Sequence, residues 1–286
     1  MVHEPVMVRR LCLYVDRFNP PYAGLIRNVV EKCREVGIEP YAAPSCADHL
    51  ATFGLDEGGK CDMGMVIGGD GTILRGLGYF LDHNVPVLGL NSGNLGFLAG
   101  AEQGDAGRVV ERIAGGEYVV GTIPVLRGTM SSGKVLRAVN DFSVNRSMMG
   151  GILYFEIFVE GERIAGVAGD GVVISTPMGS TAYSLSCGGP ILAPGLPAML
   201  VVSICPHSLS LRPLVVPDES VVSIKIGRLR STGPVVSVDG APSGSLKAGE
   251  SLEVTRDSGS CMLVRFDDEP GYYSRLSLKL GWGARG

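Results

Sequence analysis

The chain has 286 residues, a formal net charge of −4 at pH 7, and 45% hydrophobic residues. This length allows one large or two ordinary domains, and the composition excludes disorder for most of the chain. The negative charge and the lack of a basic run exclude a general attraction to nucleic acid. No apolar stretch reaches the ~20 residues of a membrane span, and no signal-peptide pattern begins the chain. The seven cysteines are scattered without a Cys-x-x-Cys pair, so we expect neither a disulfide framework nor a zinc site, and a cytoplasmic location.

Strands and helices are expected to alternate in the first 118 residues. The predicted strands are 6–15, 38–42, 63–67 and 85–90, and the predicted helices are 22–36, the segment after Thr72, and 105–114, with Asp105 as a candidate N-cap. Residues 43–60 are expected to be loop with some helix. This alternation favours a parallel sheet flanked by helices, in which ligands bind at the carboxyl ends of the strands.

From about residue 118 the pattern changes to short β-rich runs separated by turn signals. These runs are 118–129, 134–144, 152–159, 162–168, 171–175, 199–205, 220–226, 234–239, 250–255 and 261–266. Such spacing is typical of an antiparallel β domain. We therefore predict an α/β domain at 1–120, a β-rich domain at 121–267, and a helical or irregular tail at 268–286 that packs back on the first domain.

The stretch Gly68-Gly69-Asp70-Gly71-Thr72 joins an apolar strand to a helical pattern. Glycines at such a turn let the backbone approach a bound group, and the amides at a helix start favour phosphate. A carboxylate among them would repel phosphate unless a metal, a proton or a substrate hydroxyl lies between them. The alternative is an ordinary turn, since Asp and Gly are common in turns.

A second unusual stretch, residues 169–184, runs from a β-branched strand into a Pro/Gly turn lined with hydroxyl side chains. Small hydroxyls beside glycine suit hydrogen bonds to a ribose or a base edge, and Tyr183 offers a ring for stacking. The alternative is a Ser/Thr turn at a helix start, with Ser180 or Thr181 as the N-cap.

Taken together, these motifs resemble those of the NAD kinase family. The matching segments are Gly68–Thr72, Leu95–Leu98, Asn140-Asp141, Gly169–Gly171, Ser175–Tyr183, Cys205–Leu209, Arg212-Pro213, Val238–Gly240 and Leu278–Trp282. The Gly-Gly-Asp-Gly element alone is shared with diacylglycerol, sphingosine and phosphofructo-kinases. The Thr-Pro-x-Gly-Ser-Thr-Ala-Tyr element is much more specific to NAD kinases.

The resemblance implies a Rossmann-like N-terminal domain, a C-terminal antiparallel β domain, and an active site between them that is closed by oligomerisation as a homodimer or homotetramer. It implies transfer of the terminal phosphoryl of ATP, or of polyphosphate in some members, to the 2′-hydroxyl of the adenosine ribose of NAD. Asp70 corresponds to the family's proton acceptor, a role that suits a carboxylate facing a hydroxyl. A divalent cation, Mg²⁺, is expected to bind mainly through the ATP phosphates.

The resemblance also implies the nucleotide-binding residues. They are Gly68, Gly69, Asp70, Gly71, Arg75, Asn140, Asp141, Ala168, Asp170, Thr181, Ala182, Tyr183, Ser184, Leu185, Ser186 and Gly240. Simpler interpretations stay open for some of them: Arg75 as a solvated helix residue, Leu185 as core, and Asp239-Gly240 as a two-residue hairpin turn.

Two residues depart from the family pattern. Met178 replaces a threonine and removes one hydroxyl, and Ala168 stands where many relatives carry arginine. An arginine there would sense charge near the nicotinamide, so its absence leads us to expect that NADH is accepted as well as NAD.

Two other functions compete with that of an NAD kinase. A lipid kinase of the same superfamily should lack the Ser175–Tyr183 element. A non-catalytic dinucleotide-binding protein would bind the dinucleotide without turnover. Such a protein has no need of the proton acceptor, whereas Asp70 is present in this chain.

Overall fold

The computed structural model describes residues 2–3, 6–16, 22–91, 96–102, 104, 106–147, 151–229 and 232–282. Contacts within the chain divide it into two compact units. One, which we call the N-terminal unit, contains residues 1–122 and 261–286, and the other, the β unit, contains residues 123–260. The long strands β7 (Val119–Met130) and β18 (Ser251–Arg265) each begin in one unit and end in the other.

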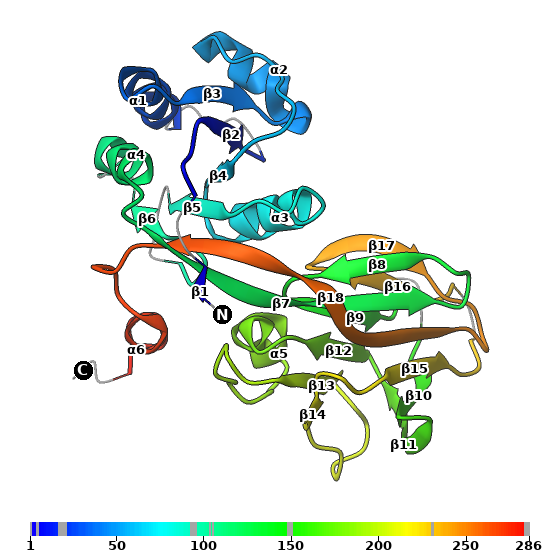
Figure 1. Ribbon diagram of the computed structural model, residues 1–286. Helices are drawn as coiled ribbons and strands as arrows, with labels where there is room; N and C mark the ends of the chain where they lie inside the picture. Colours follow the sequence, from blue (N-terminus) through cyan, green and yellow to red (C-terminus); the bar gives the residue numbers. More distant parts are fainter. Residues whose placement is uncertain are drawn as a thin grey trace. The chain divides into compact units, whose positions relative to one another are not determined.

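The N-terminal unit contains a parallel sheet with the strand order β3-β2-β4-β5 and with β6 beside β5. The elements of this unit are β1 (Val2–His3), β2 (Arg10–Tyr14), α1 (Tyr22–Glu35), β3 (Glu39–Ala42), α2 (Ala47–Leu50) between the 3-10 turns Pro44–Cys46 and Ala51–Phe53, β4 (Met63–Ile67), α3 (Asp70–Leu81), β5 (Val87–Asn91), β6 (Ala101–Glu102), α4 (Ala106–Gly115) and α6 (Tyr272–Leu280). Figure 1 shows α1 and α4 on one side of this sheet and α3 on the other.

Apolar periodicity explains these elements. Helix α1 buries Leu25, Ile26, Val29, Val30 and Cys33 at helical spacing. It is followed by Gly37, whose φ of +78° allows the left-handed turn that ends the helix. All five residues of β4 are buried, as expected for a central parallel strand covered on both faces.

The β unit consists of antiparallel strands in two sheets. Its elements are β8 (Val135–Ala138), β9 (Asp141–Asn145), β10 (Leu153–Val159), β11 (Glu162–Gly169), β12 (Gly171–Ser175), the 3-10 turn Met178–Thr181, α5 (Tyr183–Ser186), β13 (Ala198–Ile204), β14 (Leu214–Pro217), β15 (Val222–Ile226), β16 (Val235–Val238) and β17 (Ala241–Ser245). One sheet has the order β14-β13-β12-β9-β16-β17, and β11, β10, β15 and β18 lie side by side in the other. Inward-facing residues of both sheets, such as Phe142, Ile174, Phe155 and Ile224, form one hydrophobic core.

The structure corrects the predicted strands at several places. The run 134–144 is two strands, β8 and β9, interrupted at residues 139–140. Strand β17 has the sequence APSGS and was not predicted, because it pairs with β16 through its backbone and has no apolar alternation. Strand β14 is short and was missed as well, and the two runs 250–255 and 261–266 belong to the single strand β18.

Parts of the predictions lie outside the described residues, namely the candidate N-cap Asp105 and residues 92–95 of the loop after β5. In the part of the chain that the structure describes, no helix has the length and apolar character needed to cross a membrane.

Candidate functional site

Asp70 is the first residue of α3 and follows the turn at the end of β4. The N–H of Gly68 donates to Leu90 O at 3.0 Å, and Gly69 O accepts the N–H of Thr72 and of Ile73. The predicted strand, tight turn and helix are therefore present. The turn places the Asp70 carboxylate at the positive end of the helix, where a negative charge is stabilised.

Three donors hold the Asp70 carboxylate. The N–H of Phe97 donates to Oδ2 at 2.9 Å and the N–H of Leu98 to Oδ1 at 3.1 Å. Lys279 Nζ donates to Oδ2 at 2.9 Å and forms an ion pair with it. Because a carboxylate can accept roughly four hydrogen bonds, two at each oxygen, Oδ1 retains capacity for a further donor such as a hydroxyl.

These donors also decide the charge of Asp70. Burial by itself raises the pKa of this carboxyl, but the N–H of Phe97, the Lys279 ammonium and the N–H of Leu98 outweigh it, so the pKa lies below its ordinary value. Asp70 is therefore ionised at neutral pH and can accept a proton or a hydrogen bond.

The sequence motifs assign no role to Lys279, although it lies in the matched segment Leu278–Trp282. It comes from α6, 209 residues beyond Asp70. Its ammonium lies over the Phe97 ring, 4.6 Å from the centroid, an arrangement that holds a cation against an aromatic face.

Arg75 lies one turn into α3 and forms an ion pair with Asp16, with Nη2 and Oδ2 2.6 Å apart. About half of its side chain is exposed. Its guanidinium thus has a partner near the end of β2, and it is also accessible from solvent.

In the β unit, the Asp239 carboxylate binds the segment between β8 and β9. It accepts the N–H groups of Val139, Asn140 and Asp141 at 3.0, 2.7 and 3.1 Å. Asp239 and Gly240 both have positive φ, 49° and 80°, and form the two-residue turn between β16 and β17. The turn is therefore both a hairpin and a clamp on residues 139–141.

This clamp leaves one polar atom without a partner. Among the described residues, Asn140 Oδ1 is buried and accepts no hydrogen bond. The backbone of Asn140 is fixed on the other side, because its carbonyl accepts the Thr176 N–H at 2.9 Å. A buried acceptor without a donor is costly, so Asn140 Oδ1 has the capacity to accept a hydrogen bond from an N–H or O–H that binds there.

Asp141 is only 4% exposed. Burial, and then the charge of Asp239, raise the pKa of Asp141 to about 7. Burial also raises the pKa of Asp239, against the effect of its three N–H donors. Near neutral pH, Asp141 can therefore be a donor or an acceptor to a ligand hydroxyl.

We expect Asp141→Asn to stabilise the protein at pH 8 and not at pH 4. In the unfolded chain this carboxyl titrates near 3.8, and in the folded protein near 7. As the pH rises through this window the unfolded state ionises first, so stability falls and the loss is complete above pH 7. The difference corresponds to at most about 4 kcal/mol.

Thermal unfolding of both proteins at pH 4 and pH 8 measures this effect, with the pH 4 pair as the internal control. An equal change in Tm at both pH values would show that Asp141 has no raised pKa.

Most hydroxyl groups of the stretch 175–186 form hydrogen bonds to other groups within the fold. Ser184 donates to Ser175 at 2.8 Å, and both are buried. Thr176 Oγ1 donates to Val139 O at 2.9 Å. The expected alternative of Ser180 or Thr181 as an N-cap is wrong, because α5 begins after Ala182 without a side-chain cap.

The remaining predicted contacts include both exposed and half-buried residues. Tyr183 is 39% exposed, and its hydroxyl donates to Asn145 Oδ1 at 3.2 Å. Asp170 pairs with Arg146 at 2.6 Å. The others differ in exposure: Thr181, Ala182, Leu185 and Ala168 are half-buried, and Ser186 is exposed.

Comparisons with known proteins identify the family. Residues 22–118 match the family model of the ATP-NAD kinase N-terminal domain, and residues 139–266 match that of the ATP-NAD kinase C-terminal domain. An NAD kinase from Syntrophotalea carbinolica is 32% identical over 97% of this chain and 100% of its own length. The chain belongs to the NAD kinase family. An NAD kinase from Nitrosococcus oceani is 37% identical over 80% of this chain and 79% of its own.

Solved structures agree with this family and fold. Yeast NADH kinase, crystallised with NADH, has a TM-score of 0.87 and 26% identity, covering 98% of this chain and 89% of its own. An Archaeoglobus fulgidus NAD kinase, solved in complex with ATP, has a TM-score of 0.73 and 22% identity, covering 95% of this chain and 97% of its own. At this identity the likeness supports the fold alone. The family membership makes the chain a kinase of the NAD kinase class and removes the lipid-kinase interpretation.

Proposed function

We propose that this protein transfers the terminal phosphoryl of ATP to the 2′-hydroxyl of the adenosine ribose of NAD, giving NADP and ADP. Asp70 accepts the hydroxyl proton while the ribose oxygen forms its bond to phosphorus and the bond from that phosphorus to the ADP oxygen breaks. The observation that supports this role is the ionised carboxylate at the start of α3, with three donors and unused capacity at Oδ1.

We propose that the adenosine part of the dinucleotide binds to Asn140 and Asp141, which the Asp239 carboxylate holds in place. Asn140 Oδ1 lacks a donor, which an adenine amino group or a ribose hydroxyl would supply. Asp141, with its pKa of about 7, can exchange hydrogen bonds with a hydroxyl.

Mg²⁺ is proposed to enter with the phosphates of ATP, whose charge it would neutralise. Asp70 is the carboxylate of the turn 68–72, and Lys279 already binds its Oδ2. The phosphate oxygens of ATP therefore fit the role of the main Mg²⁺ ligands.

One coupled assay tests the function. Purified protein with NAD, ATP and Mg²⁺ should produce NADP, detected by an NADP-specific dehydrogenase. Binding of NAD without formation of NADP would favour the non-catalytic dinucleotide-binding alternative.

We propose NADH as a second phosphoryl acceptor beside NAD. The support is the small, uncharged Ala168 on β11 and the neutralisation of Asp170 by Arg146, together with the likeness to yeast NADH kinase across 98% of this chain. Because Ala168 carries no charge and Asp170 is neutralised by Arg146, the single charge that separates NAD from NADH should change the binding free energy by about 1 kcal/mol or less.

The expected result is that kcat/KM for NAD and for NADH differ by no more than about tenfold. Initial rates with each acceptor at constant ATP and Mg²⁺ measure this ratio. A preference of more than about a hundredfold for NAD would contradict the proposal.

A further inference from the structure

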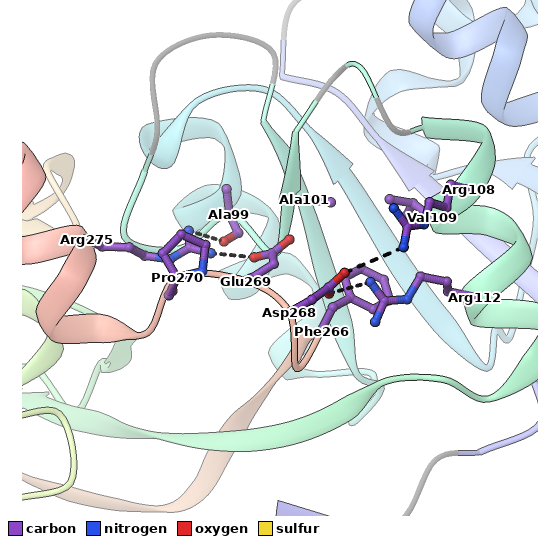
Figure 2. Close-up of a pocket in the computed structure, with 10 residues that line it drawn as sticks. All are labelled: Ala99, Ala101, Arg108, Val109, Arg112, Phe266, Asp268, Glu269, Pro270 and Arg275. Atoms are coloured by element: carbon purple, nitrogen blue, oxygen red, sulfur yellow. Dashed lines mark hydrogen bonds and ion pairs between the residues drawn. The ribbon is translucent and has the colours of Figure 1, made fainter.

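Two cationic side chains of α6, one turn apart, reach the same part of the N-terminal unit. Lys279 contacts the Asp70 carboxylate directly. Arg275 is 3% exposed and donates from Nη1 to Gly96 O at 3.0 Å and to Ala99 O at 2.7 Å. Figure 2 shows Arg275 reaching Ala99 and Glu269 from one end of a cavity of about 200 Å³.

In segment 96–99, arginine side chains bind the carbonyl groups and the Asp70 carboxylate binds the N–H groups. Arg275 holds the carbonyls of Gly96 and Ala99, and Arg265 holds that of Phe97, with Nη2 at 2.6 Å, and also that of Ala99. The N–H groups of Phe97 and Leu98 point to Asp70. Because the carbonyl of one residue and the N–H of the next lie in one planar peptide group, Arg275 at Gly96 O fixes the direction of the Phe97 N–H, and Arg265 at Phe97 O fixes that of the Leu98 N–H.

Arg275 is itself held in place. Its Nε donates to Pro270 O at 2.8 Å, and Nη2 forms an ion pair with Glu269. A buried guanidinium with partners for several of its donors has a narrow choice of positions. Arg275 is therefore suited to define where segment 96–99 lies.

We propose that α6 is a positioning element of the proton acceptor. Lys279 orients the Asp70 carboxylate directly, and Arg275 orients it through segment 96–99. This inference rests on the proposed function, and it assigns to the C-terminal helix a part in the reaction that the sequence motifs do not assign.

Among the described residues, charged groups of two elements act on Asp70: Lys279 on α6 contacts it, and Arg265 on β18 interacts with it by charge. Arg75, on the same helix as Asp70, is paired with Asp16 instead. Weakening the hydrogen bonds from segment 96–99 or removing the Lys279 ammonium favours the protonated carboxyl. Less of the acceptor is then ionised at a given pH.

The test compares Arg275→Met and Lys279→Gln with Arg112→Met as the matched control. Arg112 lines the same cavity in Figure 2, is 19% exposed, pairs with Asp268 at 2.6 Å and stacks on Phe266, but no contact links it to segment 96–99 among the described hydrogen bonds. It thus reports the general cost of losing a partly buried arginine in this unit.

For Arg275→Met and Lys279→Gln we expect kcat to fall at least tenfold at pH 7, with KM for NAD changed by less than about threefold. The acidic limb of the kcat–pH profile should move to higher pH by about half a unit or more. Arg275→Lys should recover part of the loss, because one ammonium can still donate to the carbonyls. Arg112→Met should leave kcat and the acidic limb at the wild-type values.

A second measurement does not depend on activity. NMR titration of the Asp carboxyl carbons, with Asp70→Asn to assign the signal, gives the pKa of Asp70 in each variant. If this pKa and the acidic limb are the same in Arg275→Met and Lys279→Gln as in Arg112→Met, the positioning role is wrong, even where kcat falls. If the wild type makes no NADP but the Asp70 pKa rises in both variants, the proposed function fails and the positioning of Asp70 by α6 stands.

Discussion

Asp70→Asn is expected to lower kcat by about 10²–10⁴-fold, the usual contribution of a general base. Asparagine keeps the size of the side chain and can accept the N–H of Phe97 or Leu98, so the turn should remain in place. It cannot accept the ribose proton. The Kd for NAD, measured by calorimetry, should therefore stay within about threefold of the wild type while turnover is lost.

Asp268→Asn is the matched control for this variant. Asp268 is also a carboxylate of the N-terminal unit, but it lies at the surface and pairs with Arg112. Its replacement should leave kcat unchanged. A near-normal kcat in Asp70→Asn would show that another group accepts the proton.

Gly96→Ala is expected to lower kcat by at least about tenfold, because the added methyl group would displace the Asp70 carboxylate. A Cβ at position 96 would lie 1.9 Å from Asp70 Oδ1, the oxygen with capacity for a hydroxyl. The backbone at Gly96 is not left-handed, so the added methyl acts by displacing the carboxylate rather than by straining its own residue. Steady-state kinetics, with KM for NAD and ATP measured separately, should show the loss mainly in kcat.

Gly78→Ala is the control for this change. Gly78 lies in α3 and has no atom within 4 Å of an added Cβ. This variant should keep full activity and raise the free energy of unfolding by about 0.5–1 kcal/mol, the helix preference of Ala over Gly. If Gly96→Ala is as active as Gly78→Ala, the carboxylate position is not critical for turnover.

The first domain was largely predictable because its elements are determined by local patterns. The buried face of α1 and the all-apolar β4 need only near neighbours in the sequence to be recognised. The β unit was less predictable. Strand β17 has no alternation, and the Asn140 turn interrupts a run that looks continuous. Strand β17 is determined by its hairpin pairing with β16, and the break at Asn140 by the distant Asp239 carboxylate, rather than by the side-chain pattern of their own residues.

The candidate site divides in the same way. The turn Gly68–Thr72, with a carboxylate at the start of a helix, could be read from consecutive residues, as could the hairpin Asp239-Gly240. The interpretation of the hydroxyl stretch as an N-cap failed, because Ser180 instead binds Pro177 and Leu192 within the fold. A hydroxyl in a polar turn has several possible partners, and the sequence alone does not choose among them.

By itself, the sequence determined the class of fold, the strand, tight turn and helix around Asp70, and the resemblance to NAD kinases, since these depend on local order and motif identity. Only the tertiary structure decided what surrounds Asp70. The N–H groups of segment 96–99, together with Lys279 from a helix 209 residues away, lower its pKa. It also decided that Asp239 holds residues 139–141 and leaves Asn140 Oδ1 without a donor. Hydrogen bonds and charges act over a few ångströms of space, and a linear pattern does not record which distant residues the fold brings within that range.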